Sequence, residues 1–141
     1  MGDRERIDEL LESYRSAVYA KDVDAFVALF DPNVCVFDMW GRWSYEGIDE
    51  WRQMVTGWFG SLGDERVAVE MRELRTTTAD ELAAAHVFLT FKGLSAEGRQ
   101  LRSMDNRLTW VLRKGRDGWK VVHEHSSAPI DFDTTKAVLH R

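Results

Sequence analysis

The chain has almost no cysteine, no long apolar run and no cluster of basic residues. Its single cysteine, Cys35, cannot form an internal disulfide, and no paired-cysteine metal spacing occurs. No apolar run approaches the roughly 20 residues that a membrane helix needs. Residues 1–12 are charged rather than apolar, so we expect no secretory signal. These absences predict a cytoplasmic protein that does not bind a membrane.

The charge balance and the glycine pattern exclude further classes. The formal net charge is -5, and nucleic-acid binding needs a concentrated basic face, so we expect no nucleic-acid partner. No glycine-rich phosphate loop follows any expected strand, so we expect no nucleotide or flavin. We also expect no other cofactor and no metal. With 44% hydrophobic and 30% charged residues in a chain of 141, the composition is that of one soluble domain over residues 1–141.

Hydrophobic periodicity predicts an α+β fold. Apolar residues recur at helical spacing over residues 3–20, then after Asp22, a plausible N-cap, and again after Gly47. The expected strands cover residues 34–40, 66–76, 81–92, 99–114 and 119–127. This order predicts three N-terminal helices packed on a strongly curved antiparallel sheet, with a cavity between helices and sheet.

Three polar side chains fall where this pattern places the interior. Tyr14 shares the apolar stripe of the first helix, Asp38 lies among apolar neighbours, and Asp105 lies between Met104 and Leu108. A buried polar group destabilises a fold unless it is paired. Grouped around a pocket, these residues could carry chemistry. The alternative is structural: a tyrosine hydroxyl bonded to a buried carbonyl, and a carboxylate that caps a turn.

Two stretches resemble known proteins. Residues 13–38 and 45–54, "SYRSAVYAKDVDAFVALFDPNVCVFD" and "YEGIDEWRQM", are similar to steroid ketoisomerases without a gap. Residues 105–129, "DNRLTWVLRKGRDGWKVVHEHSSAP", look like the final hairpin of SnoaL-like proteins and of the calmodulin-dependent kinase association domain. The chain thus resembles the NTF2-like superfamily, and most closely its SnoaL-like and ketosteroid-isomerase-like members. The resemblance implies a cone-shaped α+β barrel.

The resemblance also implies catalytic roles. In the isomerases, an aspartate at the place of Asp38 moves a proton between two carbons, while residues at the places of Tyr14 and Asp105 donate hydrogen bonds to the enolate oxygen. Such a protonated aspartate is known from that enzyme family itself. Arg107 departs from this pattern, because a cation on the same strand face would keep Asp105 ionised. We expect a cofactor-independent isomerase or cyclase that acts on a small hydrophobic carbonyl compound.

Further residues are expected to contact the substrate. Tryptophans near the third helix could form an aromatic cage, and the resemblance directs Glu124 and Ser126 into the cavity and His123 and His125 to the opposite side. The expected substrate-binding residues are Trp40, Met54, Trp58, Arg107, Glu124 and Ser126.

Two other functions remain open. Asp105, Arg107 and Glu124 resemble the water-activating triad of limonene-type epoxide hydrolases. A non-catalytic ligand-binding or assembly module, like the kinase association domain, is the second alternative. In every case we expect a homodimer, formed by an apolar outer sheet face that includes Leu108, Trp110 and Val121.

Overall fold

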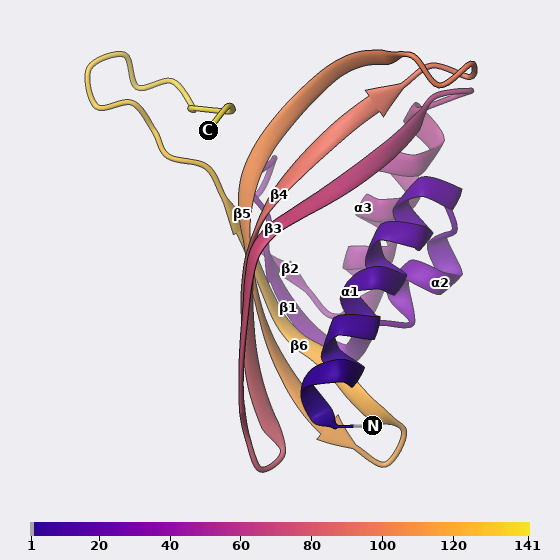
Figure 1. The fold of residues 1–141 in the computed structure, drawn as a ribbon, viewed down its shortest axis with the longest axis vertical. Helices are drawn as coiled ribbons and strands as arrows, with labels where there is room; N and C mark the ends of the chain where they lie inside the picture. The colour runs from indigo at the N-terminus through magenta and orange to yellow at the C-terminus, as the bar shows by residue number, and fades with distance from the viewer. Residues whose placement is uncertain (1) are drawn as a thin grey trace.

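The structure, a computed structural model, describes residues 2–141. Three helices precede most of the sheet (Figure 1). The elements in chain order are α1 (Asp3–Ala20), α2 (Val23–Val27), β1 (Phe30–Phe37), β2 (Tyr45–Glu46), α3 (Ile48–Ser61), β3 (Arg66–Ala79), β4 (Leu82–Leu94), β5 (Gln100–Gly115) and β6 (Gly118–Ser127).

Local signals explain where the first helices begin and end. The apolar stripe of α1 is buried against the sheet, and the helix ends at Lys21, which has a left-handed backbone conformation with φ of 56°. Asp22 caps α2, because its Oδ1 accepts a hydrogen bond of 3.0 Å from the backbone N–H of Ala25. The predicted helix and its cap are both confirmed.

The sheet has six strands in the order β2-β1-β6-β5-β4-β3. All neighbouring pairs are antiparallel except β1 and β6, which run parallel, so the sheet is mixed rather than purely antiparallel. β1 begins at Phe30, earlier than predicted, and its register with β6 shifts between Phe30 and Cys35. This irregularity accommodates Pro32, which cannot donate to a regular ladder. β1 ends at Phe37, so Asp38 lies just beyond the strand.

The long strands β3, β4 and β5 bend over the helices, so that one face of the sheet is concave (Figure 1). The helices cover this concave face, and the hydrophobic core lies between the two layers. The sheet does not close on itself, which gives the expected cone shape with one open side.

Residues 128–141 form an irregular tail on the side of the sheet opposite the helices (Figure 1). The tail returns to β5, where the backbone N–H of Asp105 donates to the carbonyl of Leu139 at 2.7 Å. β6 ends at Ser127, which pairs with Arg107, so the tail contacts β5 beyond the end of β6. Within the described residues, no helix combines the length and apolar character needed to cross a bilayer.

Candidate active site

A cavity of about 620 Å³ lies between the concave sheet face and the helices. Most of its wall is apolar and aromatic, with side chains from α1, α3, β4 and β5. A mostly apolar cavity with a few polar groups is the usual form of a small-molecule site. Its polar groups come together from segments far apart in the sequence.

Asp38 lines this cavity beside Ser126. The Ser126 hydroxyl donates to Asp38 Oδ1 at 3.0 Å, and it accepts a hydrogen bond of 3.0 Å from the backbone N–H of Met39. Burial raises the pKa of Asp38, while the hydrogen bonds from Ser126 and from the backbone of Trp40 and Met39 oppose that rise. The carboxylate is therefore both desolvated and held in one orientation, as a general base requires.

Glu124 of β6 is a second acid in the cavity wall and is only 3% exposed. Burial raises its pKa to about 8; the Trp110 hydrogen bond opposes this rise and the nearby charge of Asp38 adds to it. The Trp110 indole N–H donates to Glu124 Oε1 at 2.8 Å. At neutral pH Glu124 is thus protonated, and Oε2 is the oxygen left to carry the proton.

Tyr14 lines the same cavity as Asp38 and Glu124 and is 4% exposed. Its ring packs against Phe26, with centroids 5.1 Å apart, and edge-on against Trp110 at 5.9 Å. Burial, and then the charges of Glu124 and Asp38, raise the pKa of Tyr14 well above its ordinary value. The phenol therefore stays neutral and can donate a hydrogen bond.

Three further predicted residues line the same cavity: Trp40, Met54 and Trp58. Trp51 lines it too, packed against Phe26 and Tyr45.

A family model described as the SnoaL-like domain matches residues 7–131. The chain belongs to the SnoaL-like domain family. Its fold is that of NTF2-like proteins, as the resemblance implied.

Solved structures similar to this SnoaL-like domain agree in fold. An NTF2-like protein of unknown function from Pseudomonas putida has a TM-score of 0.86 at 24% identity, over 97% of this chain and 94% of that one. An NTF2-like protein with a cystatin-like fold from Novosphingobium aromaticivorans has a TM-score of 0.77 at 19% identity, over 94% and 84% of the two chains.

A nuclear transport factor 2-like superfamily protein from Salmonella enterica has a TM-score of 0.72 at 18% identity, over 95% of this chain and 96% of that one. The comparison with curated proteins gave no match. Similarity at identities this low supports the fold, and any function has to be argued from the residues of the cavity.

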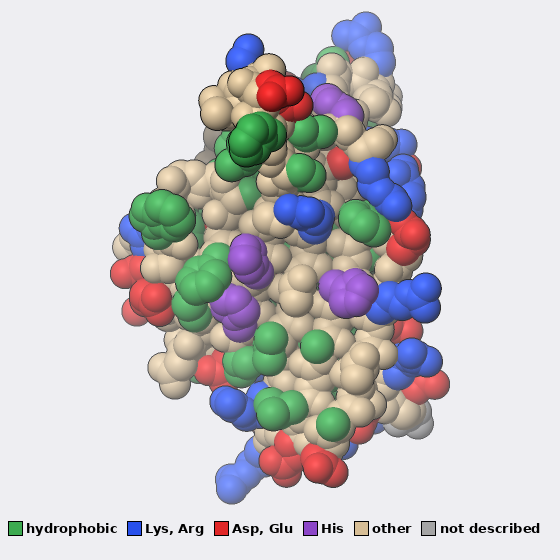
Figure 2. All heavy atoms as spheres, turned by 90° about the vertical axis from the view of Figure 1, so that its left-hand side faces the viewer, with side chains coloured by type: hydrophobic (Ala, Val, Ile, Leu, Met, Phe, Trp, Pro, Cys, Tyr) green, Lys and Arg blue, Asp and Glu red, His purple; other side chains and the backbone are tan. Residues whose placement is uncertain are grey.

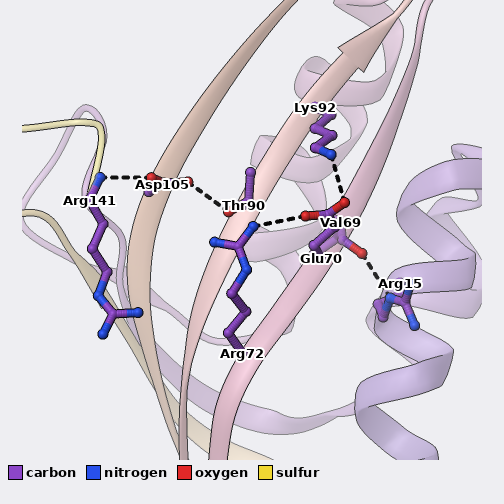
Figure 3. Close-up of polar contacts among 8 residues, drawn as sticks. All are labelled: Arg15, Val69, Glu70, Arg72, Thr90, Lys92, Asp105 and Arg141. Atoms are coloured by element: carbon purple, nitrogen blue, oxygen red, sulfur yellow. Dashed lines mark hydrogen bonds and ion pairs between the residues drawn. The ribbon is translucent and has the colours of Figure 1, made fainter. Parts of the chain in front are cut away.

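Asp105 does not face the cavity of this SnoaL-like domain, contrary to the prediction. It lies on the outer face of β5, where the Thr90 hydroxyl donates to its Oδ1 at 2.7 Å and the backbone N–H of Arg141 donates to its Oδ2 at 2.8 Å (Figure 3). The Arg141 hydrogen bond is the largest cause of a lowered pKa for Asp105. An ionised aspartate on the outer face cannot serve as the neutral donor.

Arg107 is also absent from the cavity wall. Its exposed guanidinium donates through Nε to the Ser127 hydroxyl at 3.0 Å. Because Asp105 and Arg107 lie on the sheet face opposite Glu124, the hydrolase triad considered as an alternative does not assemble. The register gives the reason: Glu124 pairs with Trp110, and paired residues point to one face, so the even-numbered residues of this part of β5 point inward.

The same parity overturns the apolar outer face that led us to expect a homodimer. Leu108, Trp110 and Val121 are all buried in the core, so they cannot form an exposed interface. Figure 2 shows that the outer face carries histidine, basic and scattered hydrophobic side chains. His123 belongs to this side, with its Nδ1 2.8 Å from the carbonyl oxygen of Cys35. The oligomeric state stays a prediction.

Sequence reasoning missed the roles of Asn106 and Trp110. Asn106 lines the cavity in place of its neighbour Asp105, and Trp110, buried beside the cavity wall, supplies the hydrogen bond to Glu124. The alternation of Leu108, Trp110 and Leu112 is the signal that identifies the inward face of β5.

Proposed function

We propose that this SnoaL-like domain is a cofactor-independent enzyme that removes a proton from the carbon next to a carbonyl of a small hydrophobic compound. The products would be those of isomerisation or of aldol-type cyclisation. One observation carries the proposal: two carboxyl groups with raised pKa values, Asp38 and Glu124, share one apolar cavity with the neutral phenol of Tyr14. Titratable groups perturbed in this way are typical of acid–base sites.

The two acids differ in the role that their surroundings favour. The hydrogen bonds donated to Asp38 by the Ser126 hydroxyl and the Trp40 backbone N–H favour its ionised form, whereas Glu124 is protonated up to a pKa of about 8. Asp38 is thus the base and Glu124 the hydrogen-bond donor, the role that the resemblance implied for Asp105. Environments that separate the pKa values of two acids in this way divide the acid and base roles between them.

The reaction follows from this division. The Asp38 carboxylate takes a proton from the α-carbon, and the electron pair of the broken C–H bond moves into an enolate whose oxygen becomes negative. The O–H groups of Glu124 and Tyr14 donate to that oxygen. Asp38 then returns the proton to another carbon, or the enolate carbon attacks a second carbonyl, whose oxygen becomes an alkoxide and takes the proton from Asp38. A donor of this kind lowers the barrier by about 3 kcal/mol.

The test is proton exchange with a simple ketone. 2-Tetralone, a bicyclic apolar ketone, is incubated in deuterium oxide with the protein, and deuterium at the carbons beside the carbonyl is followed by NMR. We expect catalysed exchange that Asp38→Asn reduces about a hundredfold or more. The exposed residue Asp8 provides the matched control, because Asp8→Asn changes the same functional group far from the cavity.

The alternative of a binding module makes a different prediction. Such a module would bind the ketone and leave exchange at the uncatalysed rate. Binding without exchange, or exchange that Asp38→Asn does not slow, would refute the proposal.

A further inference from the structure

Asn106 is a buried polar residue in the cavity wall to which the proposed reaction gives no role. The residue is 8% exposed and lines the cavity. Among the described residues its Oδ1 has no hydrogen-bond partner. Buried polar atoms in folded proteins are nearly always paired, so an unpaired acceptor in a cavity wall calls for a partner from outside the chain.

The other end of the amide is held by a weak bond. Asn106 Nδ2 donates to the thioether sulfur of Met39 at 3.3 Å, and thioether sulfur is a poor acceptor. The backbone N–H of Met39 donates to Ser126, which in turn donates to Asp38. The amide is therefore connected to the base through Met39 and Ser126, which fixes its position relative to the base.

The strand register places Asn106 relative to Ser126. Ser126, the partner of Asp38, pairs with Leu108. Asn106 lies two residues from Leu108 along β5 and on the same face. The rise of an antiparallel strand separates these two backbone positions by about 7 Å.

We propose that Asn106 determines substrate specificity by accepting, through Oδ1, a hydrogen bond from a hydroxyl or N–H group of the substrate. That group would lie further along β5 than the position of Leu108, which pairs with Ser126 beside Asp38. The substrate class is then an apolar ring compound with a carbonyl at one end and a hydrogen-bond donor at the other. The inference rests on the proposed function, because the carbonyl end is placed by Asp38 and Glu124.

A substrate without the donor leaves the buried acceptor unpaired in the complex. A site built to bond a polar group discriminates strongly against an analogue that lacks it. Discrimination between donor and non-donor ligands is therefore the property that separates a specificity role from a purely structural one.

The experiment compares three probes: 6-hydroxy-2-tetralone, 6-methoxy-2-tetralone and 2-tetralone itself. The methoxy oxygen can accept but not donate, so it tests the direction of the hydrogen bond. Dissociation constants come from quenching of tryptophan fluorescence, which needs no turnover. We expect the hydroxy compound to bind the wild-type protein about three- to tenfold more tightly than either of the others.

Two variants locate this preference. Asn106→Leu removes both polar atoms at similar size, and the preference for the hydroxy compound should disappear. Asn106→Asp keeps an acceptor oxygen and loses the donor to Met39, and the preference should remain. Ser103→Ala is the control, since it removes a polar side chain of the same strand at a position with the outward parity of Asp105 and Arg107, and it should keep the preference.

The temperature of thermal unfolding provides a second measurement, because a structural role and a specificity role of Asn106 predict opposite effects on it. Replacing an unsatisfied polar group by an apolar one of similar shape costs little or stabilises. Asn106→Leu should therefore unfold at the wild-type temperature or above it, and marked destabilisation would show that the amide serves the fold.

Three further results would overturn the inference: no binding of the hydroxy compound at millimolar concentration, equal affinities for the three probes, or a preference that survives in Asn106→Leu. These failures are distinguishable from failure of the proposed function. Proton exchange that depends on Asp38, together with equal affinities, would refute the role of Asn106 alone. A preference that depends on Asn106 without any exchange would refute catalysis alone.

Discussion

Replacing Glu124 by glutamine should stabilise the protein above neutral pH and leave its stability at pH 5 nearly unchanged. Glu124 is buried, and its pKa is raised from 4.5 to about 8. In the unfolded chain the carboxyl is exposed to water and ionises near its ordinary pKa. Between these two values the folded state holds a proton that the unfolded state has released. The free energy of unfolding therefore falls as the pH rises through this window.

The magnitude follows from the width of that window. One pH unit in which folded and unfolded states differ by one proton changes the stability by about 1.4 kcal/mol. A window from 4.5 to about 8 gives a loss of up to about 5 kcal/mol, present in full only above the folded pKa. Glutamine cannot ionise, and its amide oxygen can still accept the hydrogen bond from Trp110. Glu124→Gln should therefore lack this part of the pH dependence.

The assay is urea unfolding followed by tryptophan fluorescence at pH 5, 6, 7 and 8. Protein concentration is held constant, because association would also shift the transition. At pH 5 the two proteins should differ by about 1 kcal/mol or less, and at pH 8 the variant should be more stable by several kcal/mol. Glu97→Gln, on an exposed turn, should follow the wild type throughout. Parallel curves for wild type and Glu124→Gln would show that Glu124 is not held protonated by the fold.

Three other substitutions give shorter tests. Tyr14→Phe should slow 2-tetralone exchange about tenfold or more and leave the affinity for the ketone little changed. Trp110→Phe removes the hydrogen bond that lowers the pKa of Glu124. The exchange rate should fall at alkaline pH, where Glu124 loses its proton, and in this variant the fall should begin at a higher pH. A fall at the same pH as in the wild type would contradict the assignment of Glu124 as the donor. Asp105→Ala removes the side-chain acceptor for the tail (Figure 3), and backbone amides near Leu139 should exchange hydrogen faster by mass spectrometry; unchanged protection would contradict the role of Asp105 in holding the tail.

The helices were predictable because their signals are local. The stripe of α1 and the Asp22 cap act within a few residues, and both are as the sequence indicates. The parallel pairing of β1 with β6 was not predictable in the same way. It joins segments almost ninety residues apart, for example Cys35 with His123, and no local pattern encodes which strand lies beside which.

The site was predictable for residues whose face is set by a strong pattern. Tyr14 lies on a helix stripe, and Asp38 follows a strand whose inward residues are apolar; both line the cavity. Asp105 and Arg107 were assigned to the wrong face, because side chains alternate along a strand and an error of one residue inverts the whole set. Leu108 and Trp110 mark the inward face, and the interpretation of them as an outer surface reversed the strand.

The protonated state of Glu124 depends on contacts that only the folded chain creates. Its burial comes from segments distant in sequence, and the donor to its Oε1 is Trp110 on the neighbouring strand. A glutamine at the same place would accept that hydrogen bond without the loss of stability that a carboxyl suffers as the pH approaches 8. A structural role at this position is thus served better by glutamine than by glutamate. What only the acid provides is a proton that can move towards a developing negative charge, so the choice of a buried acid favours catalysis over simple binding.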